Sequence, residues 1–238
     1  MPVDTLMTHS ISTSTINNAT KFSHHSIQGH YHGTQGVERF ADKVKTRWSM
    51  TVGTLMDPDS PAARYGATSV TKIPILGCGI LIGGKGSTLV ISDLHLPYQH
   101  CDAFNFLDRL ATEFKVKRVL CVGDIYDNHR GSYHESEADA MGEEEEYETA
   151  MAHAKTLQGL FPNMVITLGN HDIIPRRKAK TMGLPSSMLS NMNKLFDTKS
   201  SWKWRDHYMF DSWGSYPMTV PMILDSKGRW DKNIPKVG

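Results

Sequence analysis

The chain has 238 residues, 39% of them hydrophobic, which is enough to bury a sizeable core. Its 26 basic and 25 acidic residues nearly balance, so overall charge does not hold it on nucleic acid or an acidic membrane. The first residues do not resemble a signal peptide, and no segment approaches the roughly 18 apolar residues that cross a bilayer. Three cysteines, an odd number without metal-site spacing, favour the reducing cytoplasm, where we expect the protein.

The first 87 residues carry one weak and one clear structural signal. Ser10 to Thr20 is rich in Ser, Thr and Asn and taken alone would pass for a flexible linker, although its neighbours argue against that. Residues 73–82 form an apolar run typical of a strand, and the glycine-rich segment 83–87 separates them from a second apolar run. Two such runs around a glycine-rich turn predict a β-hairpin.

Three short apolar runs follow, and each stops at a polar motif. They are residues 88–92, 118–122 and 164–168. Continuous β-branched and apolar runs of this length are typical of buried strands. Between the first two, apolar residues at helical spacing predict a helix over 101–114. This alternation predicts an α/β domain whose functional residues lie at strand ends.

The remaining segments predict further helices and strands. Residues 137–161 predict a helix, and the consecutive carboxylates of Glu143 to Glu146 are interpreted as its solvated start, because they cannot converge on one ion. Residues 176–196 predict a helical stretch broken at Gly183-Leu184-Pro185. Residues 202–210 and 218–224 predict two more strands.

Five short motifs supply atoms that bind divalent metals. Carboxylate and amide oxygens with imidazole nitrogens, and no thiolate, are the ligands of manganese, iron or zinc at a hydrolytic centre. An Asp-x-His pair at a strand end can offer two ligands to one ion, and a carboxylate such as Asp124 can bridge two. The motifs are Asp93-Leu94-His95, Gly123-Asp124-Ile125-Tyr126-Asp127, Gly169-Asn170-His171-Asp172, Thr8-His9 and Gly29-His30-Tyr31-His32-Gly33.

Each motif alone has a simpler interpretation, such as a turn, a helix cap or a loop with exposed histidines. All five in one chain are hard to attribute to chance, and together they predict metal-dependent chemistry. Two ions about 3.5 to 4 Å apart can clamp a phosphate and make hydroxide available near neutral pH. His171 is the candidate general acid, because an imidazole pKa suits the protonation of a leaving alkoxide.

The set of motifs resembles the signature of the calcineurin-like metallophosphoesterase family. In that family the lone histidine and the Gly-His-x-His motif come last, whereas here they come first. The resemblance covers nearly the whole chain when residues 88–238 are read before residues 1–86, and residues 3–7 then become the strand that precedes His9. We therefore expect one domain over residues 1–238 that is a circularly permuted member, similar to small bacterial and phage relatives.

In this permuted order the turn at residues 83–87 joins the two ends that a chain in the family order would have. Such a fusion costs little, because the termini of a compact domain often lie close together. The alternative is that His9, His30 and His32 belong to an unrelated extension.

Carried over residue by residue, the resemblance implies a β-sandwich flanked by helices (α/β/β/α) with a dinuclear site at its strand ends. It implies two divalent ions, manganese first, with iron, zinc, nickel or cobalt as alternatives. His171 would protonate the leaving oxygen or stabilise the phosphoryl charge, and Asp172 would orient its ring. The role of Asp127, which matches the motif, stays open between site and scaffold. One metal would be held by Asp93, His95, Asp124 and His32, and the other by Asp124, Asn170, His9 and His30.

One departure from the family pattern bears on the substrate. Protein Ser/Thr phosphatases have an arginine directly after the second aspartate of their motif, whereas here Asn128-His129 intervene before Arg130. This disfavours a protein phosphatase. Arg130, Arg176 and Arg177 are candidate phosphate contacts, with solvent-facing arginines as the alternative.

The sequence therefore predicts a metal-dependent phosphoesterase that hydrolyses a phosphodiester or phosphomonoester of a small or nucleotide-like molecule. A nuclease of the same family is an alternative, disfavoured by the near-neutral charge. A non-catalytic binding module on the same scaffold is another, against which the intact ligand set speaks. A rearranged gene product that folds poorly is a third, because the family order is broken between residues 238 and 1. The oligomeric state is left open.

Overall fold

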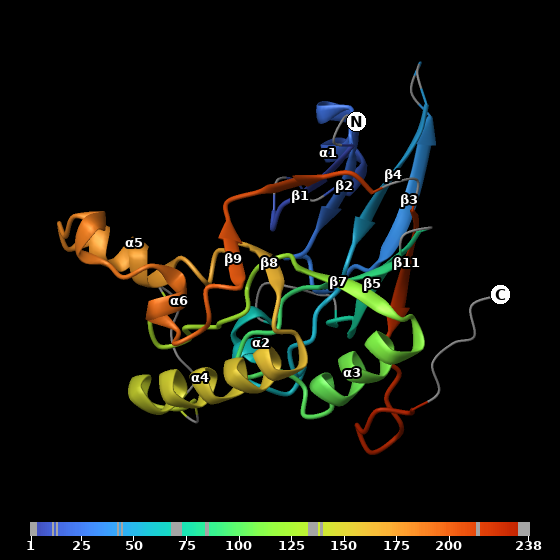
Figure 1. The fold of residues 1–238 in the computed structure, drawn as a ribbon. Helices are drawn as coiled ribbons and strands as arrows, with labels where there is room; N and C mark the ends of the chain where they lie inside the picture. Colours follow the sequence, from blue (N-terminus) through green and yellow to red (C-terminus); the bar gives the residue numbers. More distant parts are fainter. Residues whose placement is uncertain are drawn as a thin grey trace.

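A computed structural model describes residues 4–10, 12, 14–41, 43, 45–67, 73–83, 86–132, 138, 140–212 and 215–232. Two sheets pack against each other, and helices lie on their outer sides (Figure 1). The four layers are those expected from the sequence. Among the described residues, no helix is long and apolar enough to cross a membrane.

The six-stranded sheet contains the three apolar runs predicted as buried strands. Its order is β11-β5-β6-β7-β8-β9, with β6 to β9 parallel and β5 and β11 antiparallel to their neighbours. The predicted hairpin is formed by β5 and β6, although Gly84 and Lys85 of its turn lie outside the described residues. The strands are β5 (Gly77–Ile82), β6 (Ser87–Ile91), β7 (Val116–Cys121), β8 (Met164–Thr167), β9 (Trp202–Arg205) and β11 (Tyr216–Pro221).

The five-stranded sheet is built almost entirely from the first part of the chain. Its order is β10-β1-β2-β4-β3, with β1, β2 and β4 parallel. The outer strand β10, which follows the six-stranded sheet in sequence, pairs antiparallel with β1. The strands are β1 (Thr5–Met7), β2 (His25–Gln28), β3 (Gly36–Ala41), β4 (Thr46–Thr51) and β10 (Tyr208–Phe210).

The helices cover the outer faces of both sheets. The Ser- and Thr-rich segment is a helix, α1 (Thr15–Phe22), because the side chain of Ser14 accepts a hydrogen bond from the Asn17 amide and caps its first turn. In Figure 1, α3 (Ala103–Glu113) and α4 (Glu143–Leu160) lie together on the six-stranded sheet. The shorter helices are α2 (Pro61–Ala67), α5 (Ile174–Thr181), the 3-10 turn η1 (Ser186–Met188) and α6 (Met192–Leu195).

The core between the sheets draws side chains from both parts of the chain. Met50 of β4 packs directly on β5, where a Cβ at Gly79 would lie 2.8 Å from the Met50 sulfur. Cys78 and Cys121 are buried as small core residues, while Cys101 is exposed. One buried cluster includes Met7 and Met50 together with Leu89 and Trp202.

Two expectations from the sequence are wrong. The run 202–210 is two strands, β9 and β10, because the chain turns at Asp206-His207 and passes from one sheet to the other. The carboxylates at the start of α4 are not all solvated. Glu146 is 4% exposed, and its two oxygens accept hydrogen bonds from the amides of His129 (2.6 Å) and Arg130 (3.2 Å).

The shared core predicts that both parts of the chain unfold together. Met50→Ala should lower the free energy of unfolding by about 2–5 kcal/mol, because it leaves a cavity between the sheets. The midpoint of unfolding in denaturant should then shift by the same amount whether it is followed by circular dichroism or by tryptophan fluorescence. Thr46→Ala, an exposed position on the same strand, is the control and should change stability by less than about 0.5 kcal/mol. Separate transitions for the two probes would contradict a single domain.

Candidate metal centre

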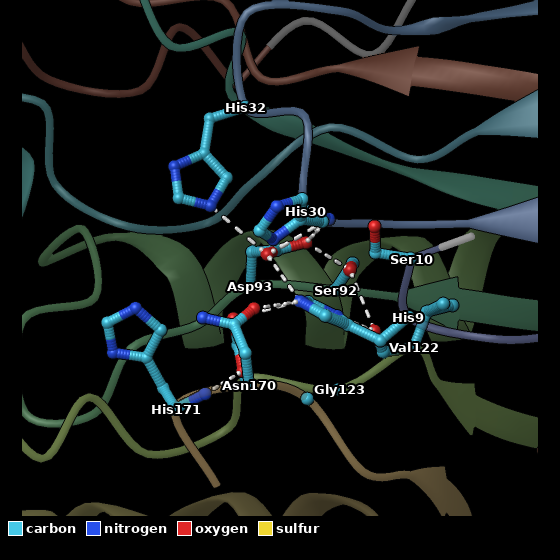
Figure 2. Close-up of polar contacts among 12 residues, drawn as sticks. His9, Ser10, His30, His32, Ser92, Asp93, Val122, Gly123, Asn170 and His171 are labelled. Carbon is cyan, nitrogen blue, oxygen red and sulfur yellow. Dashed lines mark hydrogen bonds and ion pairs between the residues drawn. The ribbon is translucent and has the colours of Figure 1, made fainter. Parts of the chain in front are cut away.

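The polar motifs of the sequence meet where strands of both sheets end. Asp93, Asp124 and Asn170 lie just past β6, β7 and β8, whose carboxyl ends share one edge because the strands are parallel. His9 and His30 lie just past β1 and β2 of the other sheet. Figure 2 shows the imidazoles of His9, His30 and His32 gathered around Asp93 and Asn170, with His171 to one side.

Asp93 is one point at which the two parts of the chain touch. It is completely buried, and its oxygens lie 3.1 and 3.0 Å from the backbone amide of His30. The Nε2 atom of His32 lies 3.1 Å from the same carboxylate, and the Ser92 hydroxyl also donates to it. Burial raises the pKa of Asp93, but the hydrogen bond from His32 and the charges of His9 and His32 outweigh it and keep the pKa below its usual value.

Asp124 pairs with His9 from the first sheet. The Nε2 atom of His9 lies 2.9 Å from Asp124 Oδ2 and 3.1 Å from Asn170 Oδ1, while Nδ1 donates to the Val122 carbonyl at 2.6 Å. Burial lowers the pKa of His9, but the charge and hydrogen bond of Asp124 and the charge of Asp93 outweigh it and raise the pKa to about 10. His9 is therefore protonated beside an ionised Asp124 at neutral pH.

The ring of His95 is directed at both carboxylates. Its Nε2 atom lies 3.9 Å from Asp93 Oδ1 and 3.9 Å from Asp124 Oδ2. This atom is buried and has no hydrogen-bond partner among the described residues. A buried polar atom without a partner is costly, and imidazole nitrogen with two carboxylates is a donor set that could hold a divalent ion.

Two sets of ligand atoms are close enough to hold ions. One set is His32, Asp93 and His95, and the other is His9, His30 and Asp124; within each, the ligand atoms lie within 4.8 Å of one another. Asn170 joins the second set through His9. The structure therefore brings together all the ligands expected from the sequence. A third set, His95, Asp127 and His171, adjoins the first.

The backbone at these positions is in a conformation that L-residues rarely adopt. Positive φ angles occur at Asp93 (51°), His95 (51°), Asp124 (48°) and His30 (69°). Such strained residues cluster at functional sites, where the surrounding structure holds them in place. The strain is distributed over both sheets, because His30 belongs to the first part of the chain.

Glycines next to the ligands permit the close approach of these loops. A Cβ at Gly169 would lie 1.9 Å from Asp124 Oδ1, and a Cβ at Gly29 would lie 2.5 Å from Asp93 Oδ2. No side chain fits at either position without moving a ligand. This is the physical reason for the glycine in each motif.

Asp172 acts differently from the prediction. Its carboxylate accepts hydrogen bonds from the amides of Asp124 (2.8 Å), Gly169 (2.9 Å) and Tyr126 (3.1 Å), so it shapes the loop that carries Asp124. The His171 ring is instead held through Nδ1 by the Asp127 carbonyl at 2.7 Å. The expectation that Asp172 orients this ring is wrong, because backbone amides take up its oxygens.

Asp127 contacts the ring of His95, one of the residues expected to bind metal. Its Oδ1 lies 2.5 Å from His95 Nδ1 and 3.4 Å from His171 Nδ1. Since Nδ1 of His95 is occupied, Nε2 is the atom directed at Asp93 and Asp124. Burial raises the pKa of Asp127, but its hydrogen bonds to His129 and His95 dominate and lower it. A supporting role of Asp127 at the site is the prediction that these contacts favour.

The predicted phosphate-binding arginines have different surroundings. The Arg130 guanidinium donates to the carbonyls of Met141 and Ala140, each at 2.8 Å, and thereby fixes a loop. Arg176 and Arg177 are exposed on α5. Their contact with a phosphate stays a prediction. Ser92 and Glu146 were missed; only the position of Ser92 directly before Asp93 could have drawn attention to it.

Comparison with known proteins bears on the same residues. A family model described as calcineurin-like phosphoesterase matches residues 86–232. This span contains Asp93, His95, Asp124, Asn170 and His171, and the structure adds histidines from the segment before it. No curated protein and no solved structure matches the sequence.

The role of Asp127 can be tested through metal affinity. Asp127→Asn keeps the shape of the side chain but removes the charge on His95, and should weaken Mn(II) binding to metal-stripped protein by about 10–100-fold. The measurement is the rise in unfolding temperature with Mn(II) concentration. Asp108→Asn, an exposed position on α3, is the matched control and should bind Mn(II) like the unaltered protein. Equal affinity in both variants would refute the supporting role.

Proposed function

Because the chain belongs to the calcineurin-like phosphoesterase family, we propose that it hydrolyses a phosphodiester or phosphomonoester with two divalent ions. Membership indicates metal-dependent hydrolysis of a phosphoester. The observation that carries the finer proposal is the buried Nε2 of His95, placed 3.9 Å from a carboxylate oxygen of both Asp93 and Asp124. This arrangement suits a cation, and the Nε2 atom makes no hydrogen bond with any described residue.

The protein would hold the ions through its oxygen and imidazole ligands, a set that suits manganese. When bound, the ions supply Lewis-acid polarisation of the phosphate and a water of lowered pKa. Asp124 would be shared, since it lies near ligands of both sets. One ion would be held by Asp93, His95, His32 and Asp124, and the other by Asp124, Asn170, His9 and His30.

His171 is the residue that would deliver a proton to the leaving oxygen. Its Nδ1 is held by the Asp127 carbonyl, so Nε2 is the atom that would act. Burial lowers the pKa of His171, but the charges of Asp124 and Asp127 outweigh burial and raise it, which favours the protonated ring that a general acid needs. Its own amide donates to Asp124 Oδ1 at 2.8 Å, which fixes the residue relative to the ligands.

We also propose that the motif order is a circular permutation. Three observations support it: His9, His30 and His32 precede the matched span 86–232, they complete the ligand sets of that span, and the β5–β6 hairpin directly joins the two segments. If the first segment were an unrelated extension, three of its histidines would not be expected to lie beside Asp93 and Asp124.

The enzymatic proposal predicts metal-dependent hydrolysis of bis-p-nitrophenyl phosphate. Metal-stripped protein should be inactive, and Mn(II) should restore activity. His171→Ala should lower kcat by about 10²–10⁴-fold for a phosphodiester whose leaving group is a weakly acidic alcohol, and by much less for bis-p-nitrophenyl phosphate, whose nitrophenolate leaves without a proton. Mn(II) binding should stay intact, because only proton transfer is removed. Asp124→Asn should lose both activity and Mn(II) binding, and the exposed variant Asp108→Asn should behave as the unaltered protein. Activity that persists without metal, or in Asp124→Asn, would overturn the proposal.

If the chain is circularly permuted, a protein with its segments rearranged into the family order should also fold. A rearranged chain opened in the turn 83–87, with residue 238 joined to residue 1 by a flexible Gly/Ser linker, should keep the stabilisation by Mn(II). Opening the chain inside β7, between Leu120 and Cys121, is the control and should prevent folding because it cuts a central buried strand. Failure of the first rearrangement to fold would contradict the proposed order.

A further inference from the structure

Basic residues are concentrated in one segment of a chain that is nearly neutral overall. From the start of α5 at Ile174 to the end of β9 at Arg205, the sequence has eight Lys and Arg residues and one acidic residue. The segment therefore carries a net charge of +7, and the rest of the chain carries −6 to give the overall +1. The acidic residue, Asp197, lies 2.7 Å from Lys155 of α4, so its charge is balanced from outside the segment. A charge asymmetry of this size favours an anionic partner.

The α5 group of basic residues comprises Arg176, Arg177 and Lys180. These three side chains are exposed, while Ile174 and Ala179 are buried, so the helix turns its basic side to solvent. In Figure 1, α5 projects from the body of the protein. Arg176 and Lys180 stand one helical turn apart on the same face, with about 5–6 Å between their Cβ atoms. The helix thus presents a short row of positive charge.

The β9 group comprises Lys203 and Arg205, on the outer strand of the six-stranded sheet. Both are exposed and lie on the same face, since side chains two residues apart on a strand point the same way. Arg205 pairs with Thr167 of β8, and its carbonyl accepts from the Leu168 amide at 2.8 Å. The strand therefore ends beside the loop that follows β8.

The two groups bracket the loop that carries Asn170 and His171. The β9 group lies where this loop leaves β8, and α5 begins where the loop ends, with the Ile174 amide donating to the His171 carbonyl at 3.0 Å. Asn170 is an expected metal ligand and His171 the expected proton donor, so positive charge flanks the reacting groups on both sides. No ion pair among the described residues involves Lys180 or Lys203.

We propose that the two groups bind the phosphate backbone of a nucleic-acid strand that crosses the metal centre. The phosphodiester cleaved is then one link of a polynucleotide, an inference that rests on the proposed function. A small ester has a single phosphate to bring to the ions, whereas a strand also has phosphates on either side of the reacting one, where the two groups lie. The nearly neutral overall charge, which disfavours a nuclease, conceals this local asymmetry.

An acidic membrane is the other anionic partner that a basic helix can bind. The exposed side chains of Met182 and Met188, which follow α5, would suit it. A membrane contact at this helix would give no role to the β9 group, which lies on the other side of the reacting loop. Phosphates on both sides of the loop account for both groups, and this favours the strand.

The first experiment measures binding in the absence of cleavage. Metal-stripped full-length protein is titrated into a fluorescein-labelled oligothymidylate of about 20 nucleotides, and anisotropy is followed at salt concentrations from about 50 to 200 mM. The logarithm of the association constant should fall as the logarithm of the salt concentration rises, with a slope of about −0.7 for each phosphate contacted. Arg176→Ala/Lys180→Ala and Lys203→Ala/Arg205→Ala should each weaken binding about tenfold and make this slope shallower.

The control removes the same charge from other exposed positions. Arg109→Ala/Lys117→Ala replaces one residue of α3 and one near the amino end of β7, and should bind the oligonucleotide like the unaltered protein. Vesicles of phosphatidylcholine and phosphatidylserine serve as the competing polyanion. The proposal is refuted by no binding of the oligonucleotide, by equal losses in the control and in the α5 and β9 variants, or by binding to the vesicles in place of the oligonucleotide.

The second experiment separates failure of the basic groups from failure of the proposed function. It compares kcat/KM of Mn(II)-loaded protein for the oligonucleotide with kcat/KM for bis-p-nitrophenyl phosphate, a small diester with no neighbouring phosphates. The ratio of the two should fall about tenfold in the α5 and β9 double variants and stay the same in the control. Hydrolysis of the small diester alone, or a ratio that neither variant changes, would overturn the proposal. Hydrolysis of neither substrate would refute the proposed function, while the binding measurements still test the basic groups directly.

Discussion

The burial of the Asp93 carboxylate is the constraint on which the arrangement of both sheets depends. A carboxylate removed completely from water must be surrounded by donors or cations. Most of them come from the first part of the chain: the His30 amide and the His32 ring reach the carboxylate, and the Asp93 carbonyl accepts from the Leu55 amide and the Thr54 hydroxyl. Within the matched family span, the Ser92 hydroxyl also donates to the carboxylate. The first part of the chain therefore contributes polar contacts to Asp93 as well as packing.

The loops around Asp124 are held together by a second buried carboxylate, that of Asp172. Asp172 collects three backbone amides from two strand-end loops, which fixes their mutual position without any contact to a ligand atom. Gly169 then permits the approach of one loop to the Asp124 carboxylate. Positive φ angles at Asp93, His95 and Asp124 are sustained because so many hydrogen bonds determine the backbone there. Rigidity of this kind holds ligands in place before an ion arrives.

The residues expected as ligands come together because they follow strand ends, and the carboxyl ends of parallel strands lie at one edge of a sheet. The apolar runs predicted the buried strands, and the family resemblance predicted the layers. The sequence could not predict the division of residues 202–210 between two sheets, because strand alternation does not tell which sheet a strand joins. Nor could it assign Glu146 or Asp172, whose partners are backbone amides distant in sequence. Backbone groups carry no residue-specific signal, so interactions with them become visible only in three dimensions.

The same buried carboxylates favour positive charge at His9 and would favour cations at the proposed site. Burial lowers the pKa of His9, yet Asp124 and Asp93 raise it to about 10, which measures how strongly two buried carboxylates favour positive charge at that position. An ion would replace that proton, since a metal-bound imidazole must be neutral on the bound nitrogen. His171 differs, because its Nδ1 is held by a backbone carbonyl. In the proposed reaction Nε2 is therefore the atom that would give its proton to the leaving oxygen.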